Sequence, residues 1–273
     1  MIRKNIFSLE DKIIVVTGRT GVLGGQFVNA IVEAGGTAII IGQNEERGNV
    51  QAATINKSSG KAFFMKADVL DEKDLIDAKY KIIAKYGKID GLVNAAGGNV
   101  PEGILQSDGD IFNLNIDGMK KAMELNLWGT IIPNQVFGPS LAITGNGSIV
   151  NISSVGSKRA LSKVLGYSMG KASIDYYTKW FAVEMANRMK DKVRINSISP
   201  GFFLSEQNKT LLINSDGSNS DRAELILKQT PFKRMGNPEE LAGALVWLLS
   251  DASKFVTGMD IVVDGGFTIN SGV

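Results

Sequence analysis

Residues 13–24 read Ile13-Ile14-Val15-Val16-Thr17-Gly18-Arg19-Thr20-Gly21-Val22-Leu23-Gly24. The four apolar residues at the start of this stretch are typical of a strand that is buried on both faces. The glycines that follow permit a tight turn, after which residues 25–34 have a helical pattern that Gly35-Gly36 ends. A pyrophosphate can approach the backbone N–H groups of such a turn at the positive end of the helix. The stretch therefore predicts the first strand, turn and helix of a dinucleotide-binding α/β fold.

The rest of the chain repeats this alternation of apolar runs and helical stretches. The further predicted strands are residues 38–41, 61–67, 91–94, 147–152, 193–198 and 260–264, and the further predicted helices are residues 45–56, 72–86, 117–135 and a helix holding Tyr167 that ends near residue 189. Strands that alternate with helices indicate a parallel sheet covered on both faces. We expect one domain, residues 1–273, built as a single doubly wound sheet of about seven strands.

Two segments lack a clear period, residues 97–118 and 202–231. Long loops at the carboxyl ends of parallel strands are where α/β folds bind ligands, so residues 202–231 are predicted to form a substrate loop. The polar tip at residues 214–220 also fits a mobile surface insertion.

Composition excludes several classes of protein and chemistry. The 273 residues carry 30 basic and 28 acidic side chains, a net charge of +2 that does not indicate a nucleic-acid surface. No apolar run approaches the ~18–20 residues that span a bilayer, and the first residues do not resemble a signal peptide, so we expect a cytosolic protein. The chain has no cysteine and no histidine, which excludes thiol nucleophiles, cysteine–zinc sites and histidine general bases.

Acid–base chemistry near neutral pH must then use tyrosine, lysine or a carboxylate. Tyr167 and Lys171 are four residues apart in a predicted helix, which places both side chains on one face. An ammonium beside a phenol favours the phenolate and is expected to lower the phenol's pKa from about 10. Such a pair also occurs by chance in most proteins, so its meaning depends on the motifs around it.

Those motifs are the glycine-rich turn, Asn94-Ala95-Ala96-Gly97, Ser154 and the Tyr-x-x-x-Lys pair, and in this combination the chain resembles the short-chain dehydrogenase/reductase family from Leu9 to its end. The resemblance implies four catalytic residues. Tyr167 would exchange a proton with the reacting oxygen, Lys171 would tune the phenol and bind the nicotinamide ribose, and Ser154 would hold the reacting oxygen. Asn126 would support a water that relays protons to Lys171. Ser153 is the rival serine, but the thirteen-residue interval to Tyr167 matches the family from Ser154.

The same resemblance implies a nicotinamide dinucleotide as cofactor. The residues it assigns to cofactor binding are Gly18, Arg19, Thr20, Gly21, Val22, Leu23, Gln43, Asn44, Asp68, Val69, Asn94, Ala95, Gly97, Tyr167, Lys171, Pro200, Gly201, Phe203 and Ser205. Val22 departs from the family pattern, which has glycine there. Asp68 and Val69 fit equally well a turn that leads into a helix.

The choice between NAD and NADP depends on the end of the second predicted strand. NAD-dependent members carry an acidic residue there, and this chain has Gly42 instead. Loss of the acid removes its bonds to the ribose hydroxyls and its repulsion of a 2′-phosphate, while Arg19 could pair with that phosphate. Gln43 stands where NADP-dependent members often have arginine. On balance the sequence favours NADP over NAD.

Within the family, the chain most resembles bacterial sugar-acid reductases of the fructuronate reductase or mannonate oxidoreductase type. The likeness is carried by residues 96–99, 134–138, 200–208, 211–212, 216–218 and 263–267, and by Lys163. It implies interconversion of a keto sugar acid and its hydroxy form, with substrate contacts from Asn99, Ser154, Lys163, Gln207 and Asn208, and it suggests a homotetramer. No metal site is expected.

Several alternatives stay open at this point. Gluconate 5-dehydrogenase activity is the nearest one, followed by a ketoacyl or steroid-type reductase and by a non-catalytic dinucleotide sensor. Val100, Lys158 and Arg159 depart from the sugar-acid pattern near the expected substrate pocket. Lys163 is the leading candidate to hold the substrate carboxylate, with Arg159 as another, although Lys163 also fits a solvated loop lysine.

Overall fold

The computed structural model describes residues 5–18, 22–58, 60–106, 108–204 and 212–272. Its strands form one parallel sheet: β1 (Ile13–Thr17), β2 (Thr37–Gly42), β3 (Ala62–Lys66), β4 (Gly91–Asn94), β5 (Gly147–Ile152), β6 (Val193–Pro200) and β7 (Asp260–Val263). Their order is β3-β2-β1-β4-β5-β6-β7. The chain thus runs outward from β1 to β3 and then returns to β4 beside β1. This reversal creates the crevice at which doubly wound sheets bind ligands. The predicted doubly wound parallel sheet is confirmed.

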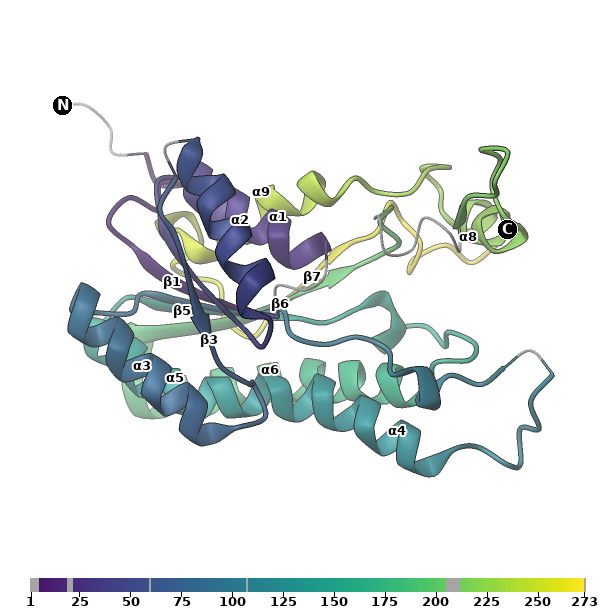
Figure 1. Cartoon of the computed structure of the whole chain (residues 1–273), viewed down its shortest axis with the longest axis horizontal. Helices are drawn as coiled ribbons and strands as arrows, with labels where there is room; N and C mark the ends of the chain where they lie inside the picture. The colour runs from purple at the N-terminus through teal and green to yellow at the C-terminus, as the bar shows by residue number, and fades with distance from the viewer. Residues whose placement is uncertain (1–4, 19–21, 59, 107, 205–211, 273) are drawn as a thin grey trace.

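Helices cover both faces of the sheet (Figure 1). One face carries α1 (Val22–Glu33), α2 (Glu45–Lys57) and α9 (Ala242–Leu249), and the other carries α3 (Glu72–Tyr86), α4 (Ile116–Met123), α5 (Gly129–Thr144) and α6 (Leu165–Met189). Alternate residues of β1 enter the two cores: Ile14 and Val16 pack under α1, whereas Ile13 and Val15 pack on the side of α3 and α5. The continuous apolar run of β1 is therefore explained by burial on both faces.

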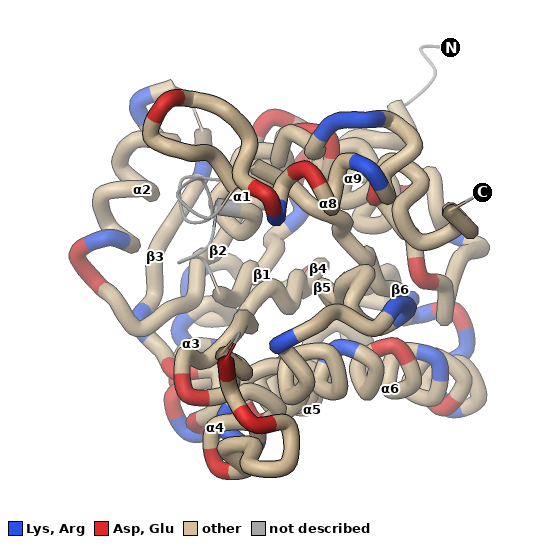
Figure 2. The backbone as a smooth tube through the Cα atoms, turned by 90° about the vertical axis from the view of Figure 1, so that its right-hand side faces the viewer, with Lys and Arg blue, Asp and Glu red and all other residues tan. Residues whose placement is uncertain are grey.

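Basic and acidic residues are interspersed along the backbone tube in Figure 2, in both helix layers. This agrees with the near-balanced net charge of +2. Among the described residues, none of the helices combines the length and the apolarity needed to cross a bilayer.

The predicted helix over residues 117–135 is confirmed as helical, but it extends to Thr144 and contains a π-helical turn. The segment is divided into α4, a π-helical turn at Glu124–Trp128 and α5. The hydrophobic pattern continues through the turn, so periodicity alone did not indicate it. The π turn contains Asn126, and π turns inside helices are frequent at functional sites.

The loop predicted over residues 202–231 contains α8 (Asp221–Gln229). Ser220 caps this helix by accepting a hydrogen bond from the backbone N–H of Ala223, and Asp221 and Glu224 lie in the first turn, where acidic residues are favoured. Ala223 and Ile226 of α8 pack with Leu212 in a small separate apolar cluster. This segment therefore has a local core above the carboxyl edge of the sheet.

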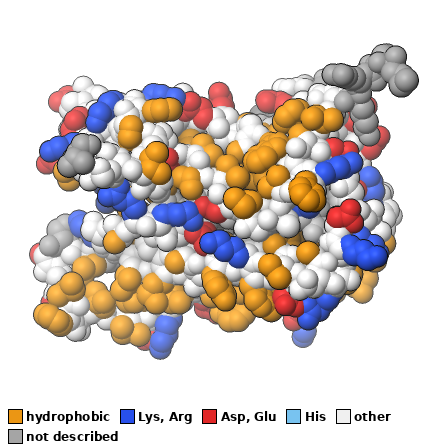
Figure 3. Space-filling model, turned by 180° about the vertical axis from the view of Figure 1, so that it is seen from behind, with side chains coloured by type: hydrophobic (Ala, Val, Ile, Leu, Met, Phe, Trp, Pro, Cys, Tyr) orange, Lys and Arg blue, Asp and Glu red, His pale blue; other side chains and the backbone are white. Residues whose placement is uncertain are grey.

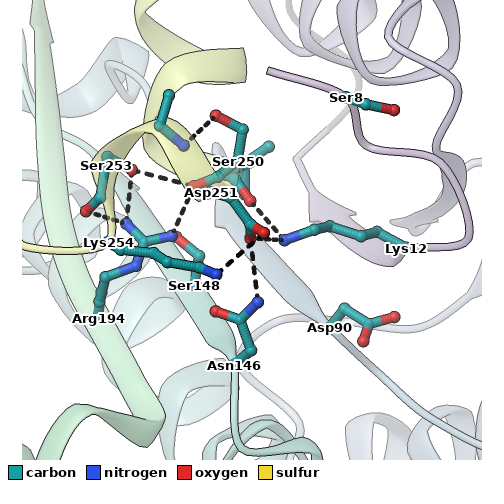
Figure 4. A network of polar contacts seen from close by, with 12 residues as sticks. Ser8, Lys12, Asp90, Asn146, Ser148, Arg194, Ser250, Asp251, Ser253 and Lys254 are labelled. Atoms are coloured by element: carbon teal, nitrogen blue, oxygen red, sulfur yellow. Dashed lines mark hydrogen bonds and ion pairs between the residues drawn. The ribbon is translucent and has the colours of Figure 1, made fainter. Parts of the chain in front are cut away.

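At the opposite, amino-terminal edge, a basal network of polar side chains ties the sheet to the segment after α9 (Figure 4). Arg194 of β6 donates to the carbonyl oxygens of Leu248, Ser250 and Ser253 at 3.0–3.1 Å. Asp251 accepts a hydrogen bond from Asn146 at 3.1 Å and forms ion pairs with Lys12 and Lys254. The basal network fixes the end of the sheet that is far from the ligand crevice.

An apolar helix face, made by Trp128, Tyr176, Trp180 and Val183, lies open on the layer of α5 and α6. Each of these side chains is at least half exposed, Trp128 to 50% and Trp180 to 52%. Hydrophobic side chains gather along the lower part of Figure 3, over the helix layer that includes α4, α5 and α6. Exposed apolar side chains on one helix layer are typical of a contact between subunits.

Candidate active site

A cleft of about 380 Å³ opens at the carboxyl ends of β1, β4, β5 and β6. The residues that line it include Gly18, Leu23, Ala95, Gly97, Gly98, Asn99, Ser153, Ser154, Tyr167, Lys171, Pro200, Gly201, Phe202 and Phe203. The strand register explains this convergence, because Thr17, Asn94 and Asn151 are aligned across neighbouring strands just below the cleft. The topology therefore brings together residues from five parts of the sequence.

Tyr167 and Lys171 lie one turn apart on α6, as predicted, and both side chains reach the cleft. The Lys171 Nζ is 5.7 Å from the centroid of the Tyr167 ring and donates to the carbonyl oxygen of Ile152 at 2.7 Å. Lys171 is only 4% exposed. The lysine is thus held by β5 in a fixed place beside the phenol.

The electrostatics of this pair differ from the expectation. Burial lowers the pKa of Lys171 to about 8, and the nearby Asp175 carboxylate acts in the opposite direction. Burial raises the pKa of the Tyr167 phenol, and a hydrogen bond with Ser154 opposes this shift. The predicted lowering of the phenol's pKa by Lys171 is therefore wrong for this structure, since burial outweighs the opposing contribution. The phenol is protonated at neutral pH and ready to donate.

Ser154 is the serine that contacts the phenol, which agrees with its preference over Ser153. The Ser153 hydroxyl instead donates to the backbone carbonyl oxygen of Lys171 at 3.3 Å. Ser154 also caps the 3-10 turn Val155–Ser157, because its Oγ accepts a hydrogen bond from the N–H of Gly156 at 3.1 Å. The turn after β5 thus fixes the position of the serine hydroxyl.

Asn126 holds the loop after β4. Its Nδ2 donates to the carbonyl oxygens of Gly98 and Ala122 at 2.8 and 2.7 Å, and its Oδ1 accepts from the N–H of Gly98 at 3.1 Å. A Cβ at Gly97 would lie 2.5 Å from the Asn126 Oδ1 and 3.1 Å from the Lys171 Nζ. Glycine is therefore required there for Asn126 and Lys171 to approach the same backbone. The predicted role of Asn126 in a proton relay stays a prediction.

The residues predicted to bind the cofactor fall into three groups. Gly18, Leu23, Ala95, Gly97, Pro200, Gly201 and Phe203 line the cleft together with Tyr167 and Lys171. Arg19, Thr20, Gly21 and Ser205 lie outside the described residues, and Val22 begins α1 with a side chain that is not described. Gln43, Asn44, Asp68, Val69 and Asn94 are described but are not among the lining residues of the cleft.

Three of the residues that do not line the cleft, Asn44, Asp68 and Asn94, form local hydrogen bonds. Asn44 caps α2 by accepting from the N–H of Arg47 at 2.9 Å. Asp68 accepts from the N–H of Leu70 at 3.0 Å, and its own N–H donates to Asp74, as in a turn that leads into α3. The buried Asn94 donates to Asn134 and Asn151 at 2.7 and 2.9 Å. These bonds give Asn44, Asp68 and Asn94 clear structural roles.

The predicted substrate residues are also divided by the structure. Asn99 and Ser154 line the cleft, whereas Gln207 and Asn208 lie outside the described residues. Lys163 is found at the wall of a second cavity of about 340 Å³, formed with residues 102–119. Its φ of 73° is in the left-handed region, which sets the direction of the chain just before α6.

Lys158 and Arg159 depart from the sugar-acid reductase pattern and were expected to contact the substrate pocket. Both make contacts outside the cleft. Arg159 donates to the carbonyl oxygens of Phe267 and Asn270 at 3.0 and 2.7 Å, which ties the segment after β7 to the turn after β5. Lys158 forms ion pairs with Asp175 and Asp260. Neither is a lining residue of the cleft. No sequence pattern indicated this cluster, because its members are far apart along the chain.

The cleft fits a dinucleotide in one observed respect. A side chain at Gly18 would collide with the backbone of Ala96, so the turn after β1 approaches the loop after β4 without an intervening side chain. Gly18, Leu23, Ala95 and Gly97 would hold the dinucleotide along this line, with Pro200 and Gly201 at the far end of the cleft.

Comparison with known proteins identifies the family to which the chain belongs. Residues 21–268 match the family described as Enoyl-(Acyl carrier protein) reductase, within the short-chain dehydrogenases/reductases. The uncharacterized oxidoreductase UxuB of Bacillus subtilis is 38% identical over 275 residues, which cover 97% of this chain and 98% of the relative.

Two solved structures are similar over nearly their whole length. A Haemophilus influenza protein with bound NAD, provisionally named a D-mannonate oxidoreductase, has a TM-score of 0.90 at 36% identity, covering 98% of this chain and 100% of that chain. A gluconate 5-dehydrogenase from Burkholderia cenocepacia, in complex with NADP and tartrate, has a TM-score of 0.83 at 29% identity, covering 97% and 98%. This chain belongs to the short-chain dehydrogenase/reductase family and is an NAD(P)-dependent enzyme that acts on CH–OH groups.

Proposed function

We propose that this enzyme interconverts a keto sugar acid and its hydroxy form, of the D-fructuronate/D-mannonate type. The observation that carries the proposal is the contact between Tyr167 and Ser154 in a cleft that also presents the Asn99 amide. Hydroxyl and amide groups suit a substrate with several hydroxyls better than an apolar ketone. The similarity to the Haemophilus protein supports a sugar acid as the substrate class.

We assign roles in the reduction to three of the predicted catalytic residues. Ser154 holds the substrate carbonyl oxygen, and the Tyr167 hydroxyl, kept protonated by its raised pKa, donates a proton to that oxygen. A nicotinamide bound in the cleft would supply the hydride that the carbonyl carbon accepts. The Lys171 ammonium, fixed on Ile152, stabilises the phenolate that Tyr167 becomes. In the oxidation the same groups act in reverse.

For the cofactor we propose a preference for NADP. Gly42 ends β2 without a carboxylate that would repel a 2′-phosphate, and Gln43 beside it is exposed. The relatives themselves differ, since the Haemophilus structure holds NAD and the Burkholderia structure holds NADP.

A gluconate 5-dehydrogenase activity is the second candidate. It is favoured by the similarity to the Burkholderia enzyme, whose complex contains tartrate, a small hydroxy acid. Both candidates require the same proton donor and carry the reacting carbonyl at the same carbon relative to the carboxylate. They differ in the configuration of the carbon beside the carboxylate.

The experiment is a panel of ketouronates and aldonates assayed in both directions with NADPH/NADP and NADH/NAD. We expect the highest kcat/KM with the fructuronate–mannonate pair. Turnover confined to 5-ketogluconate and gluconate would select the second candidate, and no turnover with any member of the panel would reject both.

Tyr167→Phe is the matched control, because it removes only the hydroxyl. We expect turnover to fall by at least ~10²-fold while cofactor binding, measured by calorimetry, is unchanged. Residual turnover close to that of the wild type would show that another group donates the proton.

A further inference from the structure

Lys158 joins the two elements that hold Ser154, Tyr167 and Lys171 to the edge of the sheet, although it does not line the cleft. Its Nζ lies 2.5 Å from the Asp175 Oδ2 and 2.8 Å from the Asp260 Oδ2. Lys158 directly follows the 3-10 turn that Ser154 caps, Asp175 lies one turn beyond Lys171 on α6, and Asp260 begins β7. One ammonium thus connects the serine loop, the catalytic helix and the edge of the sheet.

The two carboxylates are not equally compensated. The Asp260 Oδ1 also accepts hydrogen bonds from the hydroxyls of Ser197 and Ser199 at 2.8 and 2.9 Å. The Asp175 Oδ1 is buried and accepts no hydrogen bond from the described residues. Lys158 is therefore the main positive charge that neutralises Asp175. The negative charge of Asp175 that Lys158 does not neutralise acts on the neighbouring Lys171.

The surroundings of Lys171 make it responsive to that charge. On the other elements packed against it, its contacts are the Ile152 carbonyl oxygen and the region of Gly97 and the Asn126 amide, which are all neutral. On α6 it faces the titratable Tyr167 and the charged Asp175. Burial lowers the pKa of Lys171 to about 8, and Asp175 opposes this shift. Near neutral pH the ammonium that must stabilise the Tyr167 phenolate thus depends on Asp175.

We propose that Lys158 is a positioning residue that acts through Asp175, and that the Lys158–Asp175 ion pair sets the fraction of Lys171 that carries a charge. Lys158 lowers the pKa of Lys171 in two ways. It partly neutralises Asp175, and it is itself a nearby positive charge. Both effects favour the neutral amine of Lys171. Residue 158 therefore determines the upper pH limit of catalysis, whichever CH–OH substrate the enzyme uses.

The sign of each substitution follows. If the pKa of Lys171 rises, Lys171 stays protonated and the enzyme stays active up to a higher pH. If the pKa falls, the ammonium and the activity are lost at a lower pH. Lys158→Met should raise the pKa of Lys171, and Asp175→Asn should lower it. Because the Lys158 side chain is 30% exposed and hence screened by water, we expect shifts of about half a pH unit in each direction.

The direct measurement is an NMR titration of enzyme labelled with ¹³C at the lysine ε-carbon, with the Lys171 signal assigned by its loss in Lys171→Met. This readout needs no substrate, so it is independent of the proposed function. The basic limb of the kcat/KM–pH profile, for any substrate found in the panel, should move with the NMR midpoint.

Controls separate charge from folding. Lys158→Arg keeps the charge and should restore the wild-type midpoint. Lys254→Met removes a lysine of similar ion pairing in the basal network, 3.1 Å from Asp251, and should leave the midpoint unchanged. If Lys158→Met does not fold, the test rests on Asp175→Asn. This variant is expected to fold because the Lys158–Asp260 ion pair remains. A midpoint that is unchanged, or that moves upward, in folded Asp175→Asn would overturn the proposal.

Discussion

Gly42 is the residue at which cofactor choice can be tested most directly. It ends β2, and a Cβ built there would meet only the Phe64 ring, at an ordinary contact distance of 3.8 Å. A side chain at this position is therefore tolerated by the fold. A carboxylate there would accept hydrogen bonds from ribose hydroxyls and would repel a 2′-phosphate.

We accordingly expect Gly42→Asp to reduce kcat/KM for NADPH by about tenfold or more, since it places like charges close together, and to leave that for NADH unchanged or higher. Gly42→Ala, which adds only the Cβ, should keep the wild-type ratio. Steady-state kinetics with both cofactors measure this ratio. An equal loss for both cofactors would mean that residue 42 is not beside the ribose.

Lys163 provides the second test at this scale, as the proposed cation for the substrate carboxylate. Losing a charge-assisted hydrogen bond costs about 1.5–3 kcal/mol, or roughly ten- to hundredfold in affinity. Lys163→Ala should raise the KM of the sugar acid by that factor and leave the KM of the cofactor unchanged. If the sugar-acid KM does not change, Lys163 serves only the second cavity, whose wall it forms.

The i,i+4 spacing was enough to predict that Tyr167 and Lys171 share a helix face, and the family resemblance added Ser154, but neither predicted the electrostatics of the site. Ser154, Tyr167 and Lys171 converge because an i,i+4 pair on a helix faces the end of a neighbouring strand. The direction of the pKa shift of Tyr167 depends on how deeply the fold buries the ring, and burial has no signature in the spacing of two residues. The Lys158 cluster depends on contacts among three distant elements and was missed for a related reason.

At the scale of elements, strands such as β1 and β2 were predictable because they are buried on both faces and read as apolar runs. β4 and β5 have the predicted bounds, as does α3, which Asp71 caps and Gly87 ends. The π turn between α4 and α5 was not predictable, because it changes the backbone hydrogen bonds while leaving the apolar pattern continuous.

That π turn carries a prediction, because it positions the Asn126 amide on Gly98. Asn126→Ala removes three hydrogen bonds to backbone groups, so it should lower the free energy of unfolding by about 1–3 kcal/mol and weaken cofactor binding by loosening the loop after β4. Chemical denaturation and calorimetry measure the two effects. Asn115→Ala, which removes the exposed cap of α4, should cost about 1 kcal/mol and leave cofactor binding unchanged. Equal cofactor affinity in both variants would contradict the positioning role of Asn126.

At the scale of the whole molecule, the amino-terminal and carboxyl-terminal ends of the strands differ in function. The basal network fixes the amino-terminal edge with buried groups such as Arg194, whereas the carboxyl edge keeps the cleft and the loops around it. The overall fold is shared with a solved structure of 29% identity at a TM-score of 0.83.

We propose that the apolar helix face pairs subunits, in line with the homotetramer that the family resemblance suggests. Trp180→Glu places a charge in that face and should shift the molar mass measured by light scattering towards smaller species. Tyr80→Glu changes an aromatic residue of α3 that is 63% exposed, and it should leave the mass unchanged. A wild type that is monomeric, or a Trp180→Glu variant of unchanged mass, would show that this face is not an interface.

The positions of the three tryptophans have an optical consequence. Trp128 and Trp180 are half exposed on the apolar helix face, whereas Trp247 is partly buried in α9 and donates to the carbonyl oxygen of Ala252. Indole emission moves to shorter wavelength when water leaves the ring, so subunit pairing at this face would shift the fluorescence of two of the three residues and leave the third as an internal reference. Intrinsic fluorescence across a dilution series would then report the association equilibrium of the unlabelled enzyme.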